Sequence, residues 1–210
     1  MMDHFVVTIA RGYGSGGRTI GRMLAEKLGV PYYDKELLHR AADDSGINVK
    51  LFAQSDENLK RPKLFKTGKA NYSGEVIPPD SDDFISEENL FNYQAKIIRE
   101  LAETESCVIV GRCADFILKD YDYVLRIYVH APMDYCIEKT MEIHANFSRE
   151  EAERYIHKTD KRRAGYYRYF TGHDWKDADN YDLCINSSML GWDKCVALVR
   201  SYLSIKLSED

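Results

Sequence analysis

The stretch that decides the fold is ARGYGSGGRT, which occupies residues Ala10–Thr19. It directly follows the apolar run Phe5–Ile9 and leads into an amphipathic helical pattern at Arg18–Leu28. Four of the six residues from Gly12 to Gly17 are glycine, more than a simple turn requires. Glycines let backbone N–H groups point inward at an anion, and the helix that follows offers its positive end. The stretch therefore predicts an anion-binding turn between a strand and a helix.

Two known motifs fit this turn, and a tight turn without a ligand is a third interpretation. The spacing Gly12-x-Gly14-x-x-Gly17 is typical of a dinucleotide-binding site, and Gly12-x4-Gly17-Arg18-Thr19 is typical of a phosphate-binding loop with arginine in place of lysine. A cation at the helix start can hold terminal phosphates, and a threonine hydroxyl can ligate Mg²⁺. The dinucleotide motif gives these two residues no role, so the pattern favours a phosphate loop.

Short apolar runs alternate with helical patterns along the chain. The runs predict strands at Phe5–Ala10, Val30–Tyr33, Cys107–Val110, Tyr123–Val129 and Tyr181–Ile185. The helical patterns lie at Arg18–Leu28, Glu87–Glu103 and Trp192–Leu203, and a capping box of Ser148 with Glu151 opens another helix. Such alternation predicts an α/β fold, a three-layer, doubly wound parallel sheet of five strands, in a single domain spanning residues 1–210.

One stretch breaks this alternation. Residues 60–86 are rich in Lys, Gly, Ser, Pro and Asp and have weak periodicity. This composition is typical of an insertion within a domain rather than a linker between two domains. We assign an inserted segment to residues from about 46 to 86.

Charged residues follow the strands at the edge where open parallel sheets bind ligands. Asp34 follows the second strand, where it can steady Mg²⁺ through water, orient an acceptor hydroxyl or cap the next helix. Gly111-Arg112 follows the third strand and adds a cation. The run HKTDKRRAGYYRYF, residues 157–170, sets five cations against one acid, Asp160. Phosphates would explain that excess, although a charge run also forms a solvated face.

In this order the features resemble the cytidylate kinase-like group of P-loop nucleoside monophosphate kinases. The resemblance covers the whole chain: the phosphate loop, Asp34 with Arg40 six residues on, Gly111-Arg112, a basic segment, and a last strand and helix. It implies a P-loop kinase fold with a helical lid at about residues 145–172, and it places the inserted segment on the acceptor side.

The resemblance also implies roles for individual residues, with ATP as phosphoryl donor and Mg²⁺ as cofactor. The ATP phosphates would be held by Gly12, Tyr13, Gly14, Ser15, Gly16, Gly17, Arg18 and Thr19, with Thr19 ligating Mg²⁺. The acceptor would be bound by Asp34, Arg40, Arg112, Asp160, Arg163 and Arg168, with Asp160 holding either the lid or the acceptor. Arg18, Arg162 and Asp34 would be the catalytic residues.

Two positions depart from cytidylate kinase itself. Arg18 replaces its lysine, and Val110 stands where it has an acid before the Gly-Arg step. Arginine keeps the charge but is longer and forked, so it can bridge phosphates instead of acting as a point charge. The resemblance to cytidylate kinase therefore implies the fold and nucleotide binding for this chain, but it leaves the identity of the acceptor open.

Composition excludes several other classes of protein. The formal net charge of −5 gives no overall positive field for nucleic acid or an anionic membrane, and no apolar run approaches the ~20 residues of a membrane span. Five cysteines without a Cys-x-x-Cys pair predict buried, reduced thiols, and the N-terminus has no signal-peptide pattern. We therefore expect a cytoplasmic protein whose partners are small nucleotides, and nothing in the sequence supports an oligomer.

The function predicted from these features is transfer of the ATP γ-phosphoryl group to a small phosphorylated acceptor. The resemblance implies that this acceptor could be a nucleoside monophosphate such as CMP. Two alternatives stay open at this point. The altered loop and the missing acid are compatible with an ATP-binding sensor without catalysis. The match of the same turn to the dinucleotide-binding motif is compatible with an NAD-dependent oxidoreductase.

Overall fold

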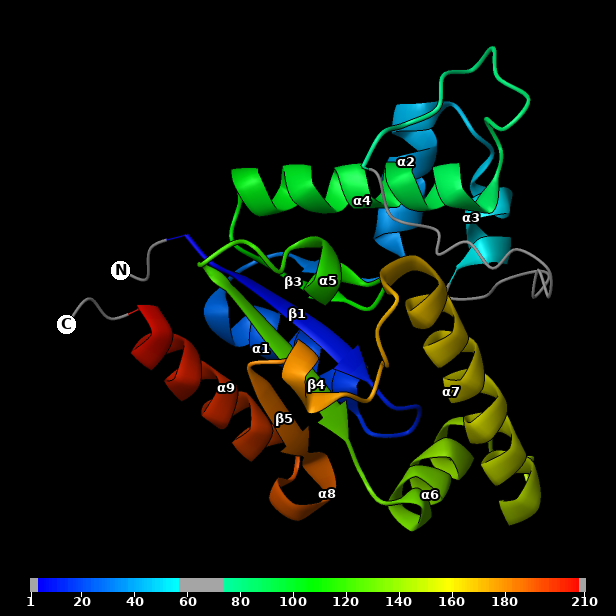
Figure 1. Ribbon diagram of the computed structural model, residues 1–210. Helices are drawn as coiled ribbons and strands as arrows, with labels where there is room; N and C mark the ends of the chain where they lie inside the picture. Colours follow the sequence, from blue (N-terminus) through cyan, green and yellow to red (C-terminus); the bar gives the residue numbers. More distant parts are fainter. Residues whose placement is uncertain (1–3, 57–73, 208–210) are drawn as a thin grey trace.

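A parallel sheet of five strands forms the centre of the molecule (Figure 1). The computed structural model describes residues 4–56 and 74–207. Within them the strand order is β2-β3-β1-β4-β5, and each neighbouring pair is parallel. The strands are β1 Val6–Arg11, β2 Tyr32–Tyr33, β3 Cys107–Val110, β4 Val124–His130 and β5 Leu183–Asn186. The predicted five-stranded parallel sheet is confirmed, and each predicted strand overlaps the observed one.

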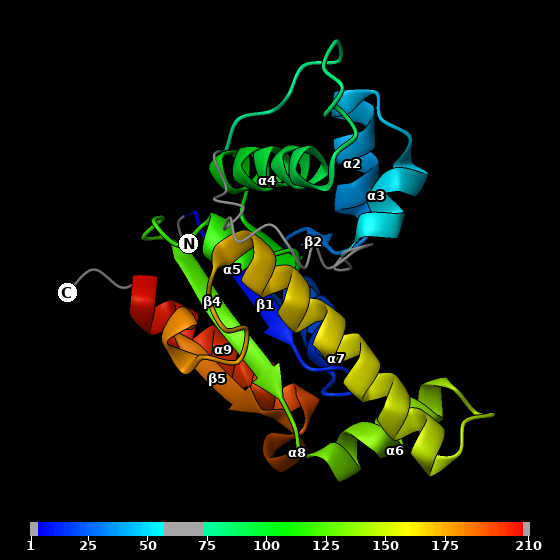
Figure 2. The same ribbon diagram turned by 45° about the vertical axis from the view of Figure 1, so that its right-hand side comes forward.

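Helices cover both faces of the sheet, which makes the fold three-layered. They are α1 Gly17–Leu28, α2 Glu36–Ser45, α3 Val49–Ser55, α4 Glu87–Thr104, α5 Ala114–Ile117, α6 Met133–Ile143, α7 Arg149–Thr171, α8 Ser187–Leu190 and α9 Trp192–Leu207, with a 3₁₀ turn at Ala178–Asn180. Figure 1 shows α2, α3 and α4 grouped at one end, and Figure 2 shows α7 passing in front of β1 and reaching α6.

The central strand explains why the apolar runs do not alternate with polar residues. All six residues of β1 are buried. Val7 and Ile9 pack with α1 and α9, whereas Val6 and Ala10 pack with α4, α5 and α7. Successive side chains of a strand point to opposite faces of the sheet. Because both faces are covered by helices, the residues that point to either face must be apolar.

The strand order places a ligand-binding crevice at the end of β1. The chain leaves β1 to β2 and β3 on one side, and later to β4 and β5 on the other. The carboxyl ends of β1 and its neighbours therefore lie where the strand order reverses, so the loops that follow them run to opposite sides and leave room for a ligand. The glycine turn of residues 12–16 starts at this point.

The stretch predicted as a lid is mostly one long helix, α7. The predicted capping box opens it: Ser148 Oγ accepts from the Glu151 amide, and the Glu151 carboxylate accepts from the Ser148 amide. The helix ends at Gly172, whose φ of 76° suits glycine. Of the predicted insertion, residues 57–73 lie outside the described part of the chain. The single domain and the insertion at 46–86 stay predictions.

The cysteine prediction needs one correction. Cys107, Cys113, Cys136 and Cys195 are buried and free, but Cys184 is exposed. The reason is that β5 is an edge strand, so its residues are covered less completely than those of β1. Within the described ranges, no helix is both long and apolar enough to cross a bilayer.

Candidate active site

The glycine turn between β1 and α1 has a backbone that only glycine tolerates at two positions. Gly14 and Gly16 have φ of 78° and 80°. A Cβ on Gly14 would lie 2.5 Å from the Cys136 carbonyl oxygen of α6, and one on Gly16 would lie 2.4 Å from Trp192 Nε1. Both the left-handed backbone and the close neighbours therefore require glycine.

Ser15 fastens the turn from inside. Its side chain is buried and its Oγ donates to the Gly12 carbonyl at 2.8 Å. The Ser15 carbonyl in turn accepts from Ser187 Oγ of α8 at 2.6 Å. The Ser15 side chain and α8 thus fix the turn, which preorganises it for binding.

A cavity of about 260 Å³ opens over this turn and the start of α1. It is lined by Arg11, Gly12, Tyr13, Gly14, Gly16, Gly17, Arg18, Thr19, Lys139, Glu142, Ile143, Arg163 and Trp192. Helix α1 has no acidic residue in its first turn, and no side chain caps it. Uncapped helix amides and a positive helix end favour an anion at this position.

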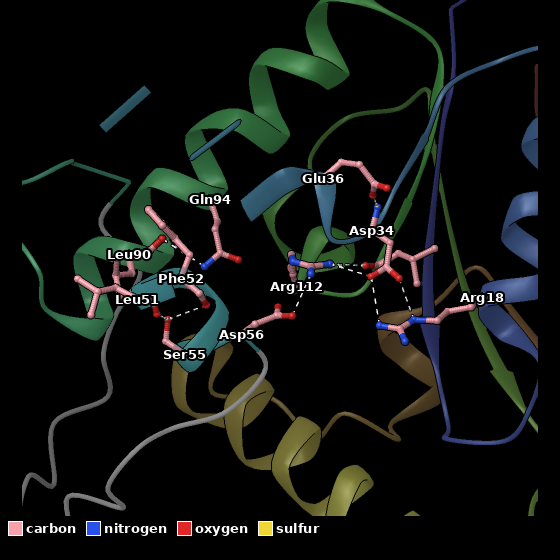
Figure 3. A network of polar contacts seen from close by, with 11 residues as sticks. Arg18, Asp34, Glu36, Leu51, Phe52, Ser55, Asp56, Leu90, Gln94 and Arg112 are labelled. Carbon is pink, nitrogen blue, oxygen red and sulfur yellow. Dashed lines mark hydrogen bonds and ion pairs between the residues drawn. The ribbon is translucent and has the colours of Figure 1, made fainter. Parts of the chain in front are cut away.

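Arg18 contacts a carboxylate of this protein from the rim of the cavity (Figure 3). Its Nε lies 2.8 Å from Asp34 Oδ2, and its Nη2 donates to Oδ1 at 3.4 Å. Its side chain is 44% exposed, so it keeps access to solvent and to the cavity. Sequence reasoning placed both residues at the site but did not predict that they form a pair.

Asp34 is the hub of a row of alternating charges. Its Oδ1 also accepts from Arg112 Nη1 at 3.1 Å, and Arg112 Nη2 donates to Asp56 Oδ2 at 3.0 Å. The Asp34 amide donates to Glu36 Oε2, which fixes the chain at the start of α2. The row Arg18–Asp34–Arg112–Asp56 therefore runs from the start of α1, next to the glycine turn, to the end of α3 (Figure 3).

Arg112 occupies an unusual backbone conformation. Gly111, Arg112 and Cys113 have φ of 78°, 55° and 56° in succession. Such a conformation costs on the order of 1–2 kcal/mol for each residue other than glycine, and strained backbone of this kind clusters at functional sites. Its guanidinium is 1% exposed, and its ion pairs with two carboxylates compensate its burial.

Helix α7 contributes two residues that contact the glycine turn and the end of β1. Asp160 Oδ1 accepts from the Tyr13 amide at 2.8 Å, and Arg163 Nη1 donates to the Arg11 carbonyl at 3.2 Å. Burial raises the pKa of Asp160, while the Tyr13 amide and the nearby Arg163 oppose that rise. These contacts attach α7 to the turn, and the contact of Asp160 with an acceptor stays a prediction.

Three of the predicted site residues have their described contacts elsewhere. Arg40 donates to the Tyr33 hydroxyl at 3.2 Å and lies over the Tyr33 ring, with no described contact to Asp34 or Arg112. Arg168 pairs with Asp174 on the surface, and the exposed Arg162 contacts Thr159 of its own helix. Arg40 also lines a pocket together with Glu100 and Thr104 of α4, and its assignment to the acceptor stays a prediction.

The site also contains residues that sequence reasoning missed. Trp192 lies against Gly16, and its buried Nε1 has no hydrogen-bond partner among the described residues. Lys139 Nζ lies 5.6 Å from the centre of the same ring. Neither residue belongs to a motif, and Trp192 follows the last strand by a few residues only. The single hint was a tryptophan at the start of a helix that follows a strand end.

The side chains present fit a magnesium ion bound together with phosphates. Thr19 lines the cavity in the first turn of α1, and no cluster of three or more His, Cys, Asp or Glu occurs in the described residues. Mg²⁺ in nucleotide sites usually takes one or two protein ligands and completes its shell with phosphate oxygens and water. Thr19 would be the protein ligand.

Comparison with known proteins agrees with this geometry. The family model described as "Cytidylate kinase-like family" matches residues 6–189. The cytidylate kinase of Methanopyrus kandleri is 24% identical over 98% of this chain and 96% of its own length. An uncharacterized protein from Eubacterium ventriosum has a TM-score of 0.71 and 25% identity, covering 95% of this chain and 98% of that one. A shikimate kinase from Bacteroides thetaiotaomicron has a TM-score of 0.54 and 14% identity, with the same coverages, and shows the fold alone.

The family match spans most of the chain. It supports a nucleotide or small-molecule kinase and favours that class over a nicotinamide-dependent oxidoreductase. With its glycine turn, its parallel sheet and the match over residues 6–189, the chain belongs to the cytidylate kinase-like family.

Proposed function

We propose that this protein transfers the γ-phosphoryl group of ATP to a small acceptor that carries a phosphate, with a nucleoside monophosphate such as CMP as first candidate. One observation carries the proposal: the preorganised turn and the uncapped start of α1 border a cavity, beside the row that begins at Arg18 and Asp34. A kinase of this family implies ATP and usually Mg²⁺.

On the donor side, the turn amides and the α1 amides would bind the ATP phosphates. They are fixed before binding, so little reorganisation is needed when charge moves toward the leaving oxygen. Bound Mg²⁺ would supply charge neutralisation between the outer phosphates. Trp192 and Lys139 also line the cavity, and we place the base and ribose of the donor against them.

On the acceptor side, we assign Asp34 and Arg112 to positioning the acceptor. A phosphate oxygen is already a nucleophile at neutral pH, so catalysis needs alignment and charge stabilisation rather than a strong base. Arg18 borders the donor cavity while it contacts Asp34, so it links the two substrates. Among the cations of α7, Arg163 lines the cavity, and we therefore give it the role that the motif gave to Arg162.

The deciding experiment is an acceptor panel. The protein is incubated with Mg-ATP and individual nucleoside monophosphates, and ADP release is followed with a coupled assay. Acceptor-dependent ADP supports the proposal and identifies the acceptor. If calorimetry shows ATP binding but no acceptor releases ADP, the sensor alternative is favoured. Absence of binding by any triphosphate would remove the phosphate-loop assignment itself.

A further inference from the structure

A second cavity, of about 410 Å³, borders the glycine turn. Gly12 and Tyr13 line both this cavity and the one assigned to the donor, so the turn forms a wall that the two share. The rest of the lining comes from β4, β5, α6, α7 and the segment that follows α7. None of the four residues in the row Arg18–Asp34–Arg112–Asp56 lines it. The second cavity is therefore separate from the acceptor side of the proposed kinase site.

Asp160 brings a carboxylate oxygen to the second cavity that is not used inside the protein. Its Oδ1 accepts from the Tyr13 amide at 2.8 Å and lies 3.6 Å from Arg163 Nη1. Its Oδ2 accepts no hydrogen bond from the described residues, and the side chain is 19% exposed. Burial, and after it the charge of Asp160, raises the pKa of both Tyr128 and Cys136, two other lining residues. The carboxylate thus lies near both walls, with Oδ2 available to a ligand that donates a hydrogen bond.

The aromatic residue in the wall does not offer a stacking face. The Tyr128 ring is 7% exposed, because Tyr181 stacks on it at 5.2 Å and Trp175 packs edge-on at 5.6 Å. A flat nucleobase would therefore find no open face on Tyr128. The other walls are aliphatic or sulfur-containing: Ile156 and Cys136 are buried in one apolar cluster, and Met133 packs against it. Such walls suit a compact aliphatic group.

Lys176 adds a positive charge to the same cavity. It follows α7, is exposed, and its side chain forms no ion pair within the described part of the chain. Its charge is one of those that oppose the rise in the pKa of Asp160, which burial causes. The second cavity therefore combines an open carboxylate oxygen, an aliphatic wall and an unpaired ammonium group.

We propose that the second cavity binds a zwitterionic amino acid with an aliphatic side chain. Its ammonium group donates to Asp160 Oδ2, its side chain packs against Met133 and Ile156, and its carboxylate faces Lys176. The bond to the partly buried Asp160 is charge-assisted and supplies most of the polar affinity. The pair with the exposed Lys176 is screened by water, so it contributes to selectivity more than to affinity. This binding site does not depend on the proposed kinase activity.

The shared wall couples the second cavity to the glycine turn. A Cβ on Gly12 would lie only 3.6 Å from Asp160 Oδ2, so a negative charge lies directly against the backbone of the turn. That charge repels a polyphosphate, and an ammonium group on Oδ2 would neutralise it. A bound amino acid should therefore tighten the binding of ATP, and ATP should tighten the binding of the amino acid by the same factor. This coupling, unlike the site itself, rests on the proposed function.

The first test is calorimetry of the full-length protein without nucleotide. The probes are leucine, isoleucine, valine and methionine, together with 4-methylpentanoate, which is leucine without its amino group, and isoamylamine, which is leucine without its carboxylate. We expect at least one of the amino acids to bind with a stoichiometry of one. The 4-methylpentanoate should bind at least about tenfold more weakly than leucine, because it cannot donate to Asp160. Isoamylamine should lose less affinity. No binding by any of the four amino acids, or equal binding of leucine and 4-methylpentanoate, would overturn the proposal.

Two further measurements place the ligand in the second cavity. Asp160→Asn keeps an oxygen for the Tyr13 amide but removes the charge, so the affinity for the amino acid should fall at least about tenfold. Asp134→Asn is the matched control, because Asp134 is a carboxylate of α6 that is 80% exposed and does not line the cavity. Saturating amino acid should also slow the alkylation of Cys184, an exposed thiol that lines the cavity, by N-ethylmaleimide. Unchanged binding by a folded Asp160→Asn variant, or an unchanged rate of alkylation, would place the ligand elsewhere and refute the assignment.

The last measurement separates this inference from the proposed function. The affinity for ATP is determined with and without the saturating amino acid, and we expect it to be about fivefold higher with it, at the lower end of typical allosteric couplings. If the amino acid binds but no triphosphate does, the proposed function fails and the second site stands. If ATP binds and none of the amino acids does, only the second site fails. If both bind without affecting each other, the coupling through Asp160 is refuted.

Discussion

Asp115 provides the sharpest physical prediction that the structure allows. It lies in α5 just after the Arg112 turn, is 4% exposed, and accepts from the Tyr167 hydroxyl at 2.6 Å. Burial raises the pKa of Asp115 from 3.8 to about 6, although the Tyr167 hydrogen bond acts in the opposite direction. The perturbation that tests this is Asp115→Asn, which removes the titrating group.

The expected sign follows from proton binding. Between about pH 4 and pH 6 the folded protein holds the Asp115 proton and the unfolded chain has released it, so the stability falls as the pH rises. A pKa shift of about two units corresponds to a loss of folding stability of at most about 3 kcal/mol. The full loss applies above pH 6, and below pH 4 there is no loss. Asparagine cannot titrate, so the variant lacks this decline.

The measurement is urea unfolding of both proteins from pH 4 to pH 8. The unfolding free energy of Asp115→Asn minus that of the wild type should increase by about 2–3 kcal/mol between pH 4 and pH 7. The lost complementarity of the amide adds a constant offset, so only the change with pH matters. A difference that stays flat across this range would refute the reasoning and show that Asp115 ionises as in the unfolded chain.

Three further predictions concern the site. Arg18→Ala should lower kcat about 10³-fold or more, while the melting temperature changes little because Arg18 is partly exposed; full turnover in this variant would contradict the transfer mechanism. Arg163→Met should reduce kcat at least about tenfold and Arg162→Ala less than about twofold, since only Arg163 lines the cavity; the opposite order in steady-state assays would restore the assignment made from the motif. Mg-ATP should change the tryptophan fluorescence through Trp192, which borders the cavity, and Trp192→Phe should lose that response while the buried Trp175 stays silent; a response that survives the substitution would move the donor base elsewhere.

Local patterns were enough to predict most of the fold. The strand at Cys107–Val110 and the helix beginning at Glu87 were located from apolar runs and spacing, because a parallel sheet covered on both faces needs continuous apolar strands. The capping box at Ser148 and Glu151 was equally readable, since its contacts join residues three apart. The glycine turn was predicted on the same grounds, from a backbone requirement that the residues themselves impose.

The partners of the charged residues could not be predicted in this way. Asp34 joins Arg18 and Arg112, residues 16 and 78 positions away along the chain. Asp160 reaches the Tyr13 amide across 147 positions. Such pairings depend on which strand ends lie next to each other in the folded sheet. In a basic run, the sequence pattern does not distinguish one arginine from its neighbour. The run at residues 157–170 therefore did not show that Arg163 faces the turn while Arg162 faces solvent.

The amino-acid sequence by itself determined the sheet and the glycine turn, and with them the prediction of an anionic ligand, because backbone conformation and helix polarity are local properties. Only the tertiary structure decided which carboxylate meets which guanidinium, as when Asp56 accepts from Arg112, and why Gly16 lies against Trp192. Those choices depend on distances between segments far apart in the chain, and those distances exist only once the sheet has formed and brought its strand ends together.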